Sequence, residues 1–209
     1  MRRLMARWSR LGSGRGFGIQ SPSAFRFVTE VVNPSRACFG GRLAKNDAKG
    51  LSKMMRRLFP LYQRMAADRQ PRLILSCGQG YDVFRRCMLA AQSGARMADI
   101  DACGEGWQLL GEADMVRVVL GKNSKQLCRM AMERLQEKAV LMVEGIHLTT
   151  ENDIFWNELT AHERGGETYD LFDCGLIFFE KKLYRQHYKI NLKNRKSHEN
   201  YQSIYKDRR

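Results

Sequence analysis

Hydrophobic positions from residue 72 onward fall into short runs that amphipathic stretches separate. The short runs predict strands at 72–76, 96–100, 115–120, 139–143, 168–173 and 175–180. The stretches between them have helical spacing and predict helices at about 81–92, 105–111, 123–136 and 151–162. This alternation favours the α/β class, with a mostly parallel sheet that helices cover on both faces.

The last two predicted strands are the closest together. They meet at Asp173 and Cys174, and a connection that short cannot lead to a parallel neighbour. We therefore expect an antiparallel hairpin at the edge of the sheet. Between the strands at 115–120 and 139–143 there is room for one helix and no further strand, so we expect six strands in all.

Two helices are predicted before the sheet. Ser21 can cap the first, with Pro22 at its first position, and Phe25, Val28 and Val32 follow on one face. The second runs from about Leu51 to Asp68, and Pro60 is expected to kink or divide it. Its apolar face consists of Met54, Met55, Leu58, Leu61, Tyr62 and Met65.

Charge divides the chain into a nearly neutral middle and two basic ends. Residues 1–16 carry +5 and residues 181–209 carry +8, which leaves +1 of the total +14 for the rest. Basic ends can bind nucleic acid or an anionic membrane through phosphate contacts, or they can be solvated tails. We expect a basic flexible lead-in at 1–16, an N-terminal helical segment at 17–71, a Rossmann-like domain at 72–191 and a basic C-terminal tail at 192–209.

The sequence has no stretch of the roughly 20 apolar residues that a membrane span needs, and no apolar region follows the basic N-terminus as in a signal peptide. Its six cysteines are scattered, with no Cys-x-x-Cys pair. Buried, reduced thiols are the expected state. These features together predict a cytoplasmic protein.

The stretch "LSCGQGYD" is the main candidate for a binding site. Ser76, Gly78 and Gly80 lie between a predicted strand and the next helix, where ligands of open α/β sheets bind. Asp101 follows the second strand, 23 residues beyond Gly78, and can accept hydrogen bonds from the ribose of an adenosine ligand. Val83 stands where a dinucleotide turn has its third glycine, which disfavours NAD. The alternative is a glycine turn that only connects strand to helix.

Several segments resemble a family of small class I S-adenosylmethionine-dependent methyltransferases, which look like catechol-type O-methyltransferases in fold. Members typically open with "GIHSPF", carry "DDIHWS" after a strand, and finish with "IDLFDLGIVFF" and "KQHY". The resemblance spans residues 16 to about 191, and the terminal hairpin is its most specific part. The matching pieces here are Gly18 to Pro22, Glu144 to His147, Trp156, Asp170 to Phe179 and Gln186 to Tyr188.

The chain departs from this family at several places. Ser76 stands where the family has an acid that contacts the methionine amino group, and Gly145 replaces one of the paired acids. Gln20 replaces the usual histidine. The predicted sheet is also one strand short of a full methyltransferase. The resemblance to this family therefore implies a degenerate member that binds S-adenosylmethionine weakly or not at all.

The resemblance also implies roles for particular residues. The backbone from Gly78 to Gly80 would pack against the cofactor, Asp101 would hold its ribose, and Glu144 or His147 would orient or deprotonate an acceptor hydroxyl. With one acid left, we expect no metal. Other roles stay open: Asp101 can cap a helix, His147 can be a satisfied loop residue, and Glu144 can be a surface carboxylate. Trp156 is expected in the core.

Three functions follow from these observations. The first is an S-adenosylmethionine-dependent methyltransferase that would transfer a methyl group to the oxygen of a small acceptor. The second is a catalytically inactive binding or scaffold protein of the same fold, and the third is a nucleic-acid-associated protein that uses its basic ends. An edge hairpin can also form a homodimer.

Overall fold

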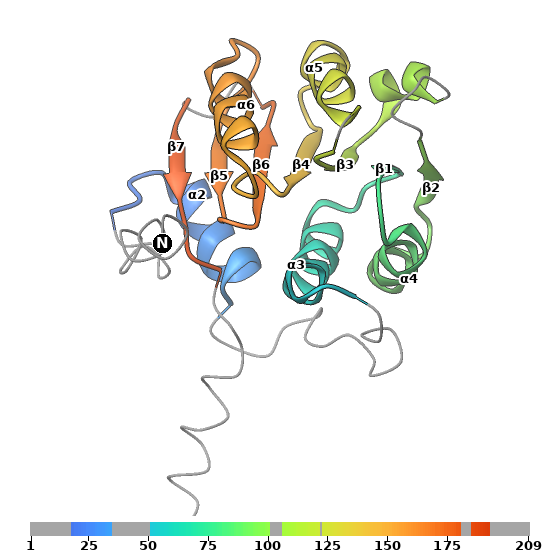
Figure 1. Cartoon of the computed structure of the whole chain (residues 1–209). Coiled ribbons are helices and arrows are strands. Elements are labelled where there is room, and N and C mark those ends of the chain that lie inside the picture. The colour runs from blue at the N-terminus through green and yellow to red at the C-terminus, as the bar shows by residue number, and fades with distance from the viewer. Residues whose placement is uncertain (1–17, 35–50, 101–105, 122, 181–184, 193–209) are drawn as a thin grey trace, which may run out of the picture.

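The computed structural model describes residues 18–34, 51–100, 106–121, 123–180 and 185–192. A seven-stranded sheet forms the centre of the molecule, in the order β2-β1-β3-β4-β6-β5-β7 (Figure 1). The strands are β1 (Leu73–Cys77), β2 (Arg96–Asp99), β3 (Met115–Val119), β4 (Val140–Glu144), β5 (Thr168–Asp170), β6 (Cys174–Phe178) and β7 (His187–Lys189). β6 is antiparallel to both of its neighbours, and the other pairs are parallel. This confirms the predicted Rossmann-like α/β sheet with an antiparallel hairpin near its C-terminal end.

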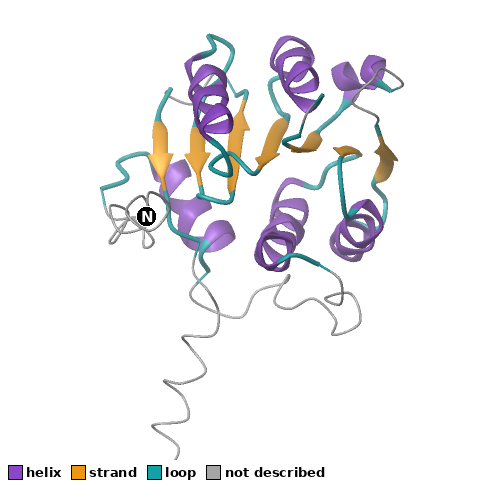
Figure 2. Ribbon diagram, viewed as in Figure 1, coloured by secondary structure: helices purple, strands orange, loops and turns teal. Residues whose placement is uncertain are grey.

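Helices cover both faces of the sheet (Figure 2). One face carries α2 (Pro22–Arg26), the π-helix η2 (Phe27–Val32), α3 (Lys53–Arg69) and α4 (Tyr81–Ala91). The other face carries the 3₁₀ helix η3 (Trp107–Glu112), α5 (Ser124–Arg134) and α6 (Thr150–Ala161). Each face of the sheet has its own hydrophobic core. Because side chains alternate along a strand, Ile74 of β1 packs in the core on the α3 side, and Leu73 and Leu75 pack in the core on the α5 side.

The expected number of six strands is wrong, because β7 adds a seventh. It pairs in parallel with β5, so β7 is the edge strand and the β5–β6 hairpin lies inside the sheet. β7 has three residues, of which only Tyr188 is partly buried, stacked on Tyr169 with ring centroids 5.3 Å apart. A strand this short and exposed has no hydrophobic pattern that a sequence can reveal. Between β3 and β4, the described residues form one helix and no strand, as expected.

The first helix begins as predicted and then departs from α-helical geometry. Ser21 caps it by accepting a hydrogen bond from the Ala24 backbone N–H at 3.3 Å. From Phe27 the helix is a π-helix, in which the Asn33 N–H bonds to the Val28 carbonyl at 2.9 Å. The wider turn changes which residues face the core: Val28 and Val32 are buried, but Phe25 is 47% exposed, contrary to the predicted face.

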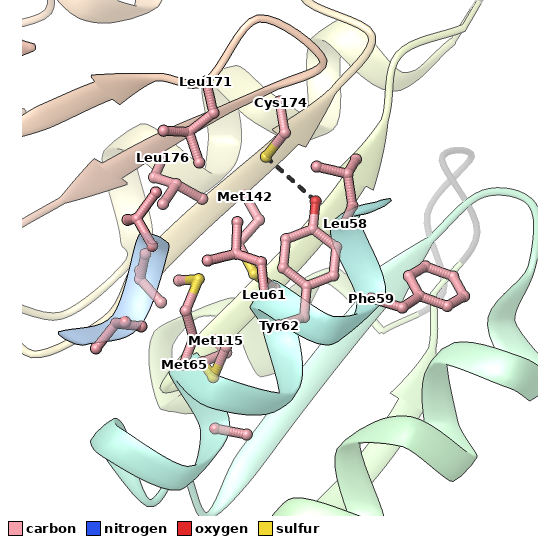
Figure 3. Close-up of a cluster of buried hydrophobic side chains, with 14 of the residues drawn as sticks. Leu58, Phe59, Leu61, Tyr62, Met65, Met115, Met142, Leu171, Cys174 and Leu176 are labelled. Atoms are coloured by element: carbon pink, nitrogen blue, oxygen red, sulfur yellow. Dashed lines mark hydrogen bonds between the residues drawn. The ribbon is translucent and has the colours of Figure 1, made fainter. Parts of the chain in front are cut away.

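The second helix, α3, is continuous through Pro60, which does not divide it. Its apolar face packs on the sheet as predicted, although Met54 is only partly buried. Figure 3 shows this cluster, in which residues of α3 lie against side chains from the strands. The labelled members are Leu58, Phe59, Leu61, Tyr62, Met65, Met115, Met142, Leu171, Cys174 and Leu176.

Three arginines bind the backbone carbonyls at helix ends. Arg164 donates to the carbonyls of Met132 (2.8 Å) and Leu135 (2.7 Å) at the end of α5. Arg64 makes the same kind of contact with the end of η2, and Arg185 with the end of α6. Cations at these positions satisfy carbonyls that a helix cannot pair internally and oppose the negative end of its dipole.

The remaining expectations concern membrane spans, cysteines, one helix and the division of the chain into segments. In the part of the chain that the structure describes, no helix is long and apolar enough to cross a membrane. The described cysteines, at positions 77, 87, 128 and 174, are buried and outside any disulfide bond, as predicted. The predicted α-helix at 105–111 is instead the 3₁₀ helix η3, which begins after Gly106 and contains Gly111. The boundaries of the four segments expected from the sequence stay predictions.

Candidate functional site

The glycine turn between β1 and α4 lies where the order of the strands reverses. From β1 the chain moves to β2 on one side and then returns to β3 on the other side. The connection that leaves β1 and the connection that leaves β3 therefore run in opposite directions along the sheet. Ligands of open α/β sheets bind outside the carboxyl ends of such strands. Gly78 and Gln79 are exposed at this point, and Gly80 precedes α4 in a left-handed conformation, with φ of 79°.

Both glycines of the turn adopt positive φ, and Gly78 in addition has no room for a side chain. Gly78 has a φ of 112°, and a Cβ there would lie 2.7 Å from the Cβ of Val119. A Cβ on Gly80 would lie 3.3 Å from the sulfur of Met55. The positions that side chains would occupy at the two glycines point into the protein, so the outer side of the turn is backbone at these residues, with Gln79 exposed between them. The backbone therefore fits a ligand that lies on the turn, and it equally fits a turn that only connects two elements.

Arg117, in the middle of β3, lies directly beneath this turn. Its Nε donates to Glu144 Oε1 at 2.6 Å, its Nη1 to Ser76 Oγ at 3.0 Å, and its Nη2 to the carbonyl of Gln79 at 2.8 Å. The side chains of Arg117 and Glu144 are 0% exposed. A fully buried arginine thus joins β1, β4 and the glycine turn.

The surroundings of this ion pair are largely apolar. The guanidinium carbon of Arg117 lies 4.9 Å from the centre of the Phe84 ring and 5.4 Å from that of Phe59, which are cation–π distances. The second oxygen of Glu144, Oε2, is buried and has no hydrogen-bond partner among the described residues. Glu144 is therefore not the surface carboxylate that one alternative expected.

Tyr62 and Cys174 form a second buried contact near the ion pair. The Tyr62 hydroxyl donates to Cys174 Sγ at 3.2 Å (Figure 3). Burial, with the added effect of the nearby Glu144 carboxylate, raises the pKa of Tyr62 well above its usual value. Burial also raises the pKa of the Cys174 thiol. Both groups therefore stay neutral at physiological pH.

His147 lies in the loop after β4, at the same edge of the sheet, and carboxylates face both of its ring nitrogens. Nε2 lies 2.9 Å from Asp170 Oδ2, and Nδ1 is bonded to Asp153. Both nitrogens can donate at once only in the imidazolium form. Asp170 is 2% exposed and Asp153 is 48% exposed, so the Asp153 contact is the one that solvent or a ligand can reach.

The turn between β5 and β6 contacts the His147 ring on the side of Nε2. Phe172 adopts a φ of 74°, rare for a side chain of this size. Its N–H donates to Asp170 Oδ1 at 2.9 Å, and its ring lies 5.6 Å from that of His147. Arg57 of α3 binds Asp173 of the same turn at 2.5 Å. The two aspartates of the turn thus fix it against the loop after β4 and against α3.

The structure brings some of the predicted site residues together and separates others. Ser76 and Glu144 share Arg117 as a partner, whereas His147 contacts α6 and the β5–β6 turn instead. Asp101 lies outside the described residues, as do the basic segments at 1–17 and 193–209. Trp156 is 1% exposed and belongs to the core, as expected. Among the residues that the structure describes, no three His, Cys, Asp or Glu side chains form a metal-binding group.

Arg117 is the residue that sequence reasoning missed. The signal is a single arginine inside the apolar run "MVRVV", which is typical of a strand buried on both faces. A charge at the centre of such a run needs a buried partner.

A cavity of about 730 Å³ lies away from the glycine turn, near the start of β1 and β3. Charged residues of both signs line it, among them Asp68, Arg69, Arg72, Asp114 and Lys138. Several of the lining charges form ion pairs, as Arg72 does with Asp114 at 3.4 Å. The cavity is thus not at the predicted cofactor edge.

No protein-family model matches the chain, and no curated protein matches it. Solved structures with a similar arrangement include a methyltransferase from Geobacter sulfurreducens (14% identity, 59% of this chain and 78% of that chain, TM-score 0.47). A methyltransferase from Podospora anserina, solved with S-adenosylhomocysteine, is 16% identical (64% and 81%, TM-score 0.43). The O-methyltransferase TomG from Streptomyces achromogenes, solved with S-adenosylmethionine, is 14% identical (61% and 80%, TM-score 0.41). At these TM-scores the likenesses carry no argument about the activity of this chain, and its fold class follows from its own strand order.

Proposed function

We propose that this chain binds S-adenosylmethionine and its product S-adenosylhomocysteine at the glycine turn, and that it is a methyltransferase acting on a small acceptor. One observation carries the proposal: the turn from Gly78 to Gly80 lies at the reversal of the strand order, where the connections that leave β1 and β3 run in opposite directions. The resemblance in sequence supports the same cofactor.

The residues of the turn would hold the ligand through their backbone. The Cβ positions of Gly78 and Gly80 point toward Val119 and Met55, so that no side chain of these two residues would separate the backbone from the ligand. Asp101 would accept hydrogen bonds from the ribose hydroxyls. When bound, S-adenosylmethionine supplies an electrophilic methyl group, and the protein has to orient the acceptor in line with it.

His147 is assigned the role of accepting the proton of the acceptor hydroxyl. Its Nδ1 partner, Asp153, is half exposed, so an acceptor can take the place of that carboxylate, while the buried Asp170 holds the other nitrogen. A histidine oriented by a buried carboxylate suits proton transfer. Glu144 is assigned a positioning role, because it is fully buried and holds Arg117.

A second candidate is a catalytically inactive protein of the same fold that binds a ligand or a partner. The observation in its favour is Arg117, whose positive charge lies beneath the turn at the place where the expected acid is replaced by Ser76. Both candidates share the fold and differ in whether methyl transfer takes place.

Calorimetric titration of S-adenosylmethionine and S-adenosylhomocysteine into the full chain tests the proposal. We expect micromolar binding, and we expect Asp101→Ala to weaken it at least tenfold, with Glu112→Ala, which removes an exposed carboxylate at the end of η3, as the control. An assay of methyl transfer to catechol-type acceptors would then separate the two candidates. The active candidate would show turnover that His147→Ala abolishes, and the inactive candidate would show none. No heat from either ligand at millimolar concentration would overturn the cofactor assignment.

A further inference from the structure

We infer that Arg117 is a positioning residue for the ligand of the glycine turn, because it fixes the orientation of the peptide bond between Gln79 and Gly80. The inference rests on the proposed function, since it concerns the same turn. It adds a fully buried residue of β3 that acts on the ligand through the backbone of the turn.

One hydrogen bond sets the direction of this peptide bond. Nη2 of Arg117 donates to the carbonyl of Gln79 at 2.8 Å, from the buried side of the turn. Among the described residues no peptide bond is cis, and in a trans peptide the C=O and the N–H point in opposite directions. The N–H of Gly80 therefore points away from Arg117 and toward the outer side of the turn, where Gln79 is exposed.

The glycine at position 80 does not fix this orientation by itself. A flip of the peptide plane changes ψ of Gln79 and φ of Gly80, and a glycine adopts positive and negative φ about equally readily. The φ of Gly80 is 79°, and the opposite sign is open to it as well. A contact from outside the turn therefore has to select one orientation, and Arg117 makes that contact.

The guanidinium can hold the carbonyl because its other nitrogens are already fixed. Nε of Arg117 donates to Glu144 Oε1 at 2.6 Å, and Nη1 donates to Ser76 Oγ at 3.0 Å. The rings of Phe84 and Phe59 lie 4.9 Å and 5.4 Å from the guanidinium carbon. Since the guanidinium is a planar fork with its N–H groups in set directions, these contacts leave Nη2 aimed at the turn.

This role depends on geometry and not on net charge, because Glu144 neutralises Arg117 beneath the turn. S-adenosylmethionine and S-adenosylhomocysteine carry the same carboxylate and ribose oxygens, and these can accept a hydrogen bond from a backbone N–H. A hydrogen bond from a charged donor shifts an equilibrium by roughly tenfold or more. Loss of the contact should therefore weaken both ligands by the same factor, about tenfold.

Calorimetric titration of both ligands into the full chain and two variants tests the inference. Arg117→Met with Glu144→Met removes the donor and its counter-ion together, so that neither charge is left buried alone. We expect both dissociation constants to rise about tenfold in this double variant. Tyr62→Phe is the matched control, because it removes a buried hydrogen bond to Cys174 and leaves the contact of Arg117 with the turn in place. We expect its dissociation constants to stay as they are in the original chain.

A spectroscopic measurement separates positioning from stability. Gln79 and Gly80 form the only Gln–Gly pair in the sequence, so ¹³C at the glutamine carbonyls and ¹⁵N at the glycines together select this peptide bond in an NMR spectrum. We expect the chemical shift of the Gln79 carbonyl carbon to change in the double variant and to stay unchanged in Tyr62→Phe. In the original chain, the Gly80 amide signal should move when either ligand is added.

A further variant keeps the test decisive if the double variant does not fold, which thermal unfolding establishes. Arg117→Lys keeps the charge beside Glu144, but a single ammonium group cannot reproduce the planar fork, and we expect the same losses. Affinity lost without a change at the Gln79 carbonyl, a changed carbonyl with unchanged affinity, or an equal loss in Tyr62→Phe would overturn the inference alone. Binding of neither ligand to the original chain would overturn the proposed function and, with it, this role of Arg117.

Discussion

Arg117 donates a hydrogen bond from Nη1 to the hydroxyl of Ser76 at 3.0 Å, across neighbouring strands at the same register position. The sequence resemblance places an acid at position 76, and the structure places a buried cation beside the serine that replaces it. The charge beneath the glycine turn is therefore supplied by β3, with Glu144 of β4 as its counter-ion.

The first prediction concerns the stability of this ion pair. Arg117→Met leaves Glu144 buried without its partner, and we expect the free energy of unfolding to fall by about 3–5 kcal/mol. Arg117→Met combined with Glu144→Met replaces both charges by apolar groups, and we expect the double variant to recover most of that loss. Urea unfolding measures both. A double variant as unstable as the single one would contradict the predicted coupling.

The second prediction concerns the need for glycine at position 78. Gly78→Ala forces a side chain into a φ of 112° and against Val119, and we expect a loss of about 2 kcal/mol or more. Gly121→Ala is the matched control, because no atom lies within 4 Å of the Cβ that it would add. Chemical denaturation of the two variants should give clearly different midpoints. A Gly78 variant as stable as the Gly121 variant would mean that the turn relaxes.

Most elements of the fold could be predicted because their residues repeat with the period of the structure they form. The helix α5 keeps its apolar residues on one face, and β1 and β4 are continuous apolar runs buried on both sides. The strand β7 has no such pattern, since its only partly buried residue is Tyr188. This strand depends on backbone hydrogen bonds with β5, such as the one from the Thr168 N–H to the Gln186 carbonyl at 2.8 Å.

The candidate site could be predicted in its position but not in its charge. Ser76 and the two glycines follow a recognisable strand, so their place at the carboxyl edge follows from local pattern. The contact of Arg117 with Ser76 depends on the pairing of β1 with β3, and its contact with Glu144 on the pairing of β3 with β4. Strand register joins residues 27 and 41 positions apart, which no local periodicity encodes.

The third prediction concerns the arginines at helix ends. Arg164→Met removes the hydrogen bonds to the last carbonyls of α5, and we expect the free energy of unfolding to fall by about 1–2 kcal/mol. Arg134→Met removes the same charge from an exposed position at the end of the same helix, and we expect a change of about 0.5 kcal/mol or less. Thermal unfolding at two salt concentrations compares them. Equal losses would show that net charge, and not the capping geometry, decides the stability.

The fourth prediction concerns acid stability at the start of β1. Desolvation raises the pKa of Asp114, but hydrogen bonds from the Arg72 backbone and side chain and from the Leu73 backbone outweigh it, so the pKa lies below its ordinary value of 3.8. A carboxyl whose pKa is lower in the folded state stabilises the protein above the unfolded value and loses that effect as the pH falls through the folded one. Asp114→Asn should therefore lower the free energy of unfolding by about 1 kcal/mol at pH 7 and by less at pH 3. Urea unfolding at both pH values measures the difference. Glu112→Gln, which removes a nearby exposed carboxylate, is the control, and we expect it to change the free energy of unfolding at pH 7 by about 0.5 kcal/mol or less. An equal loss at pH 7 and pH 3 in Asp114→Asn would mean that the aspartate acts through its shape and not through its charge.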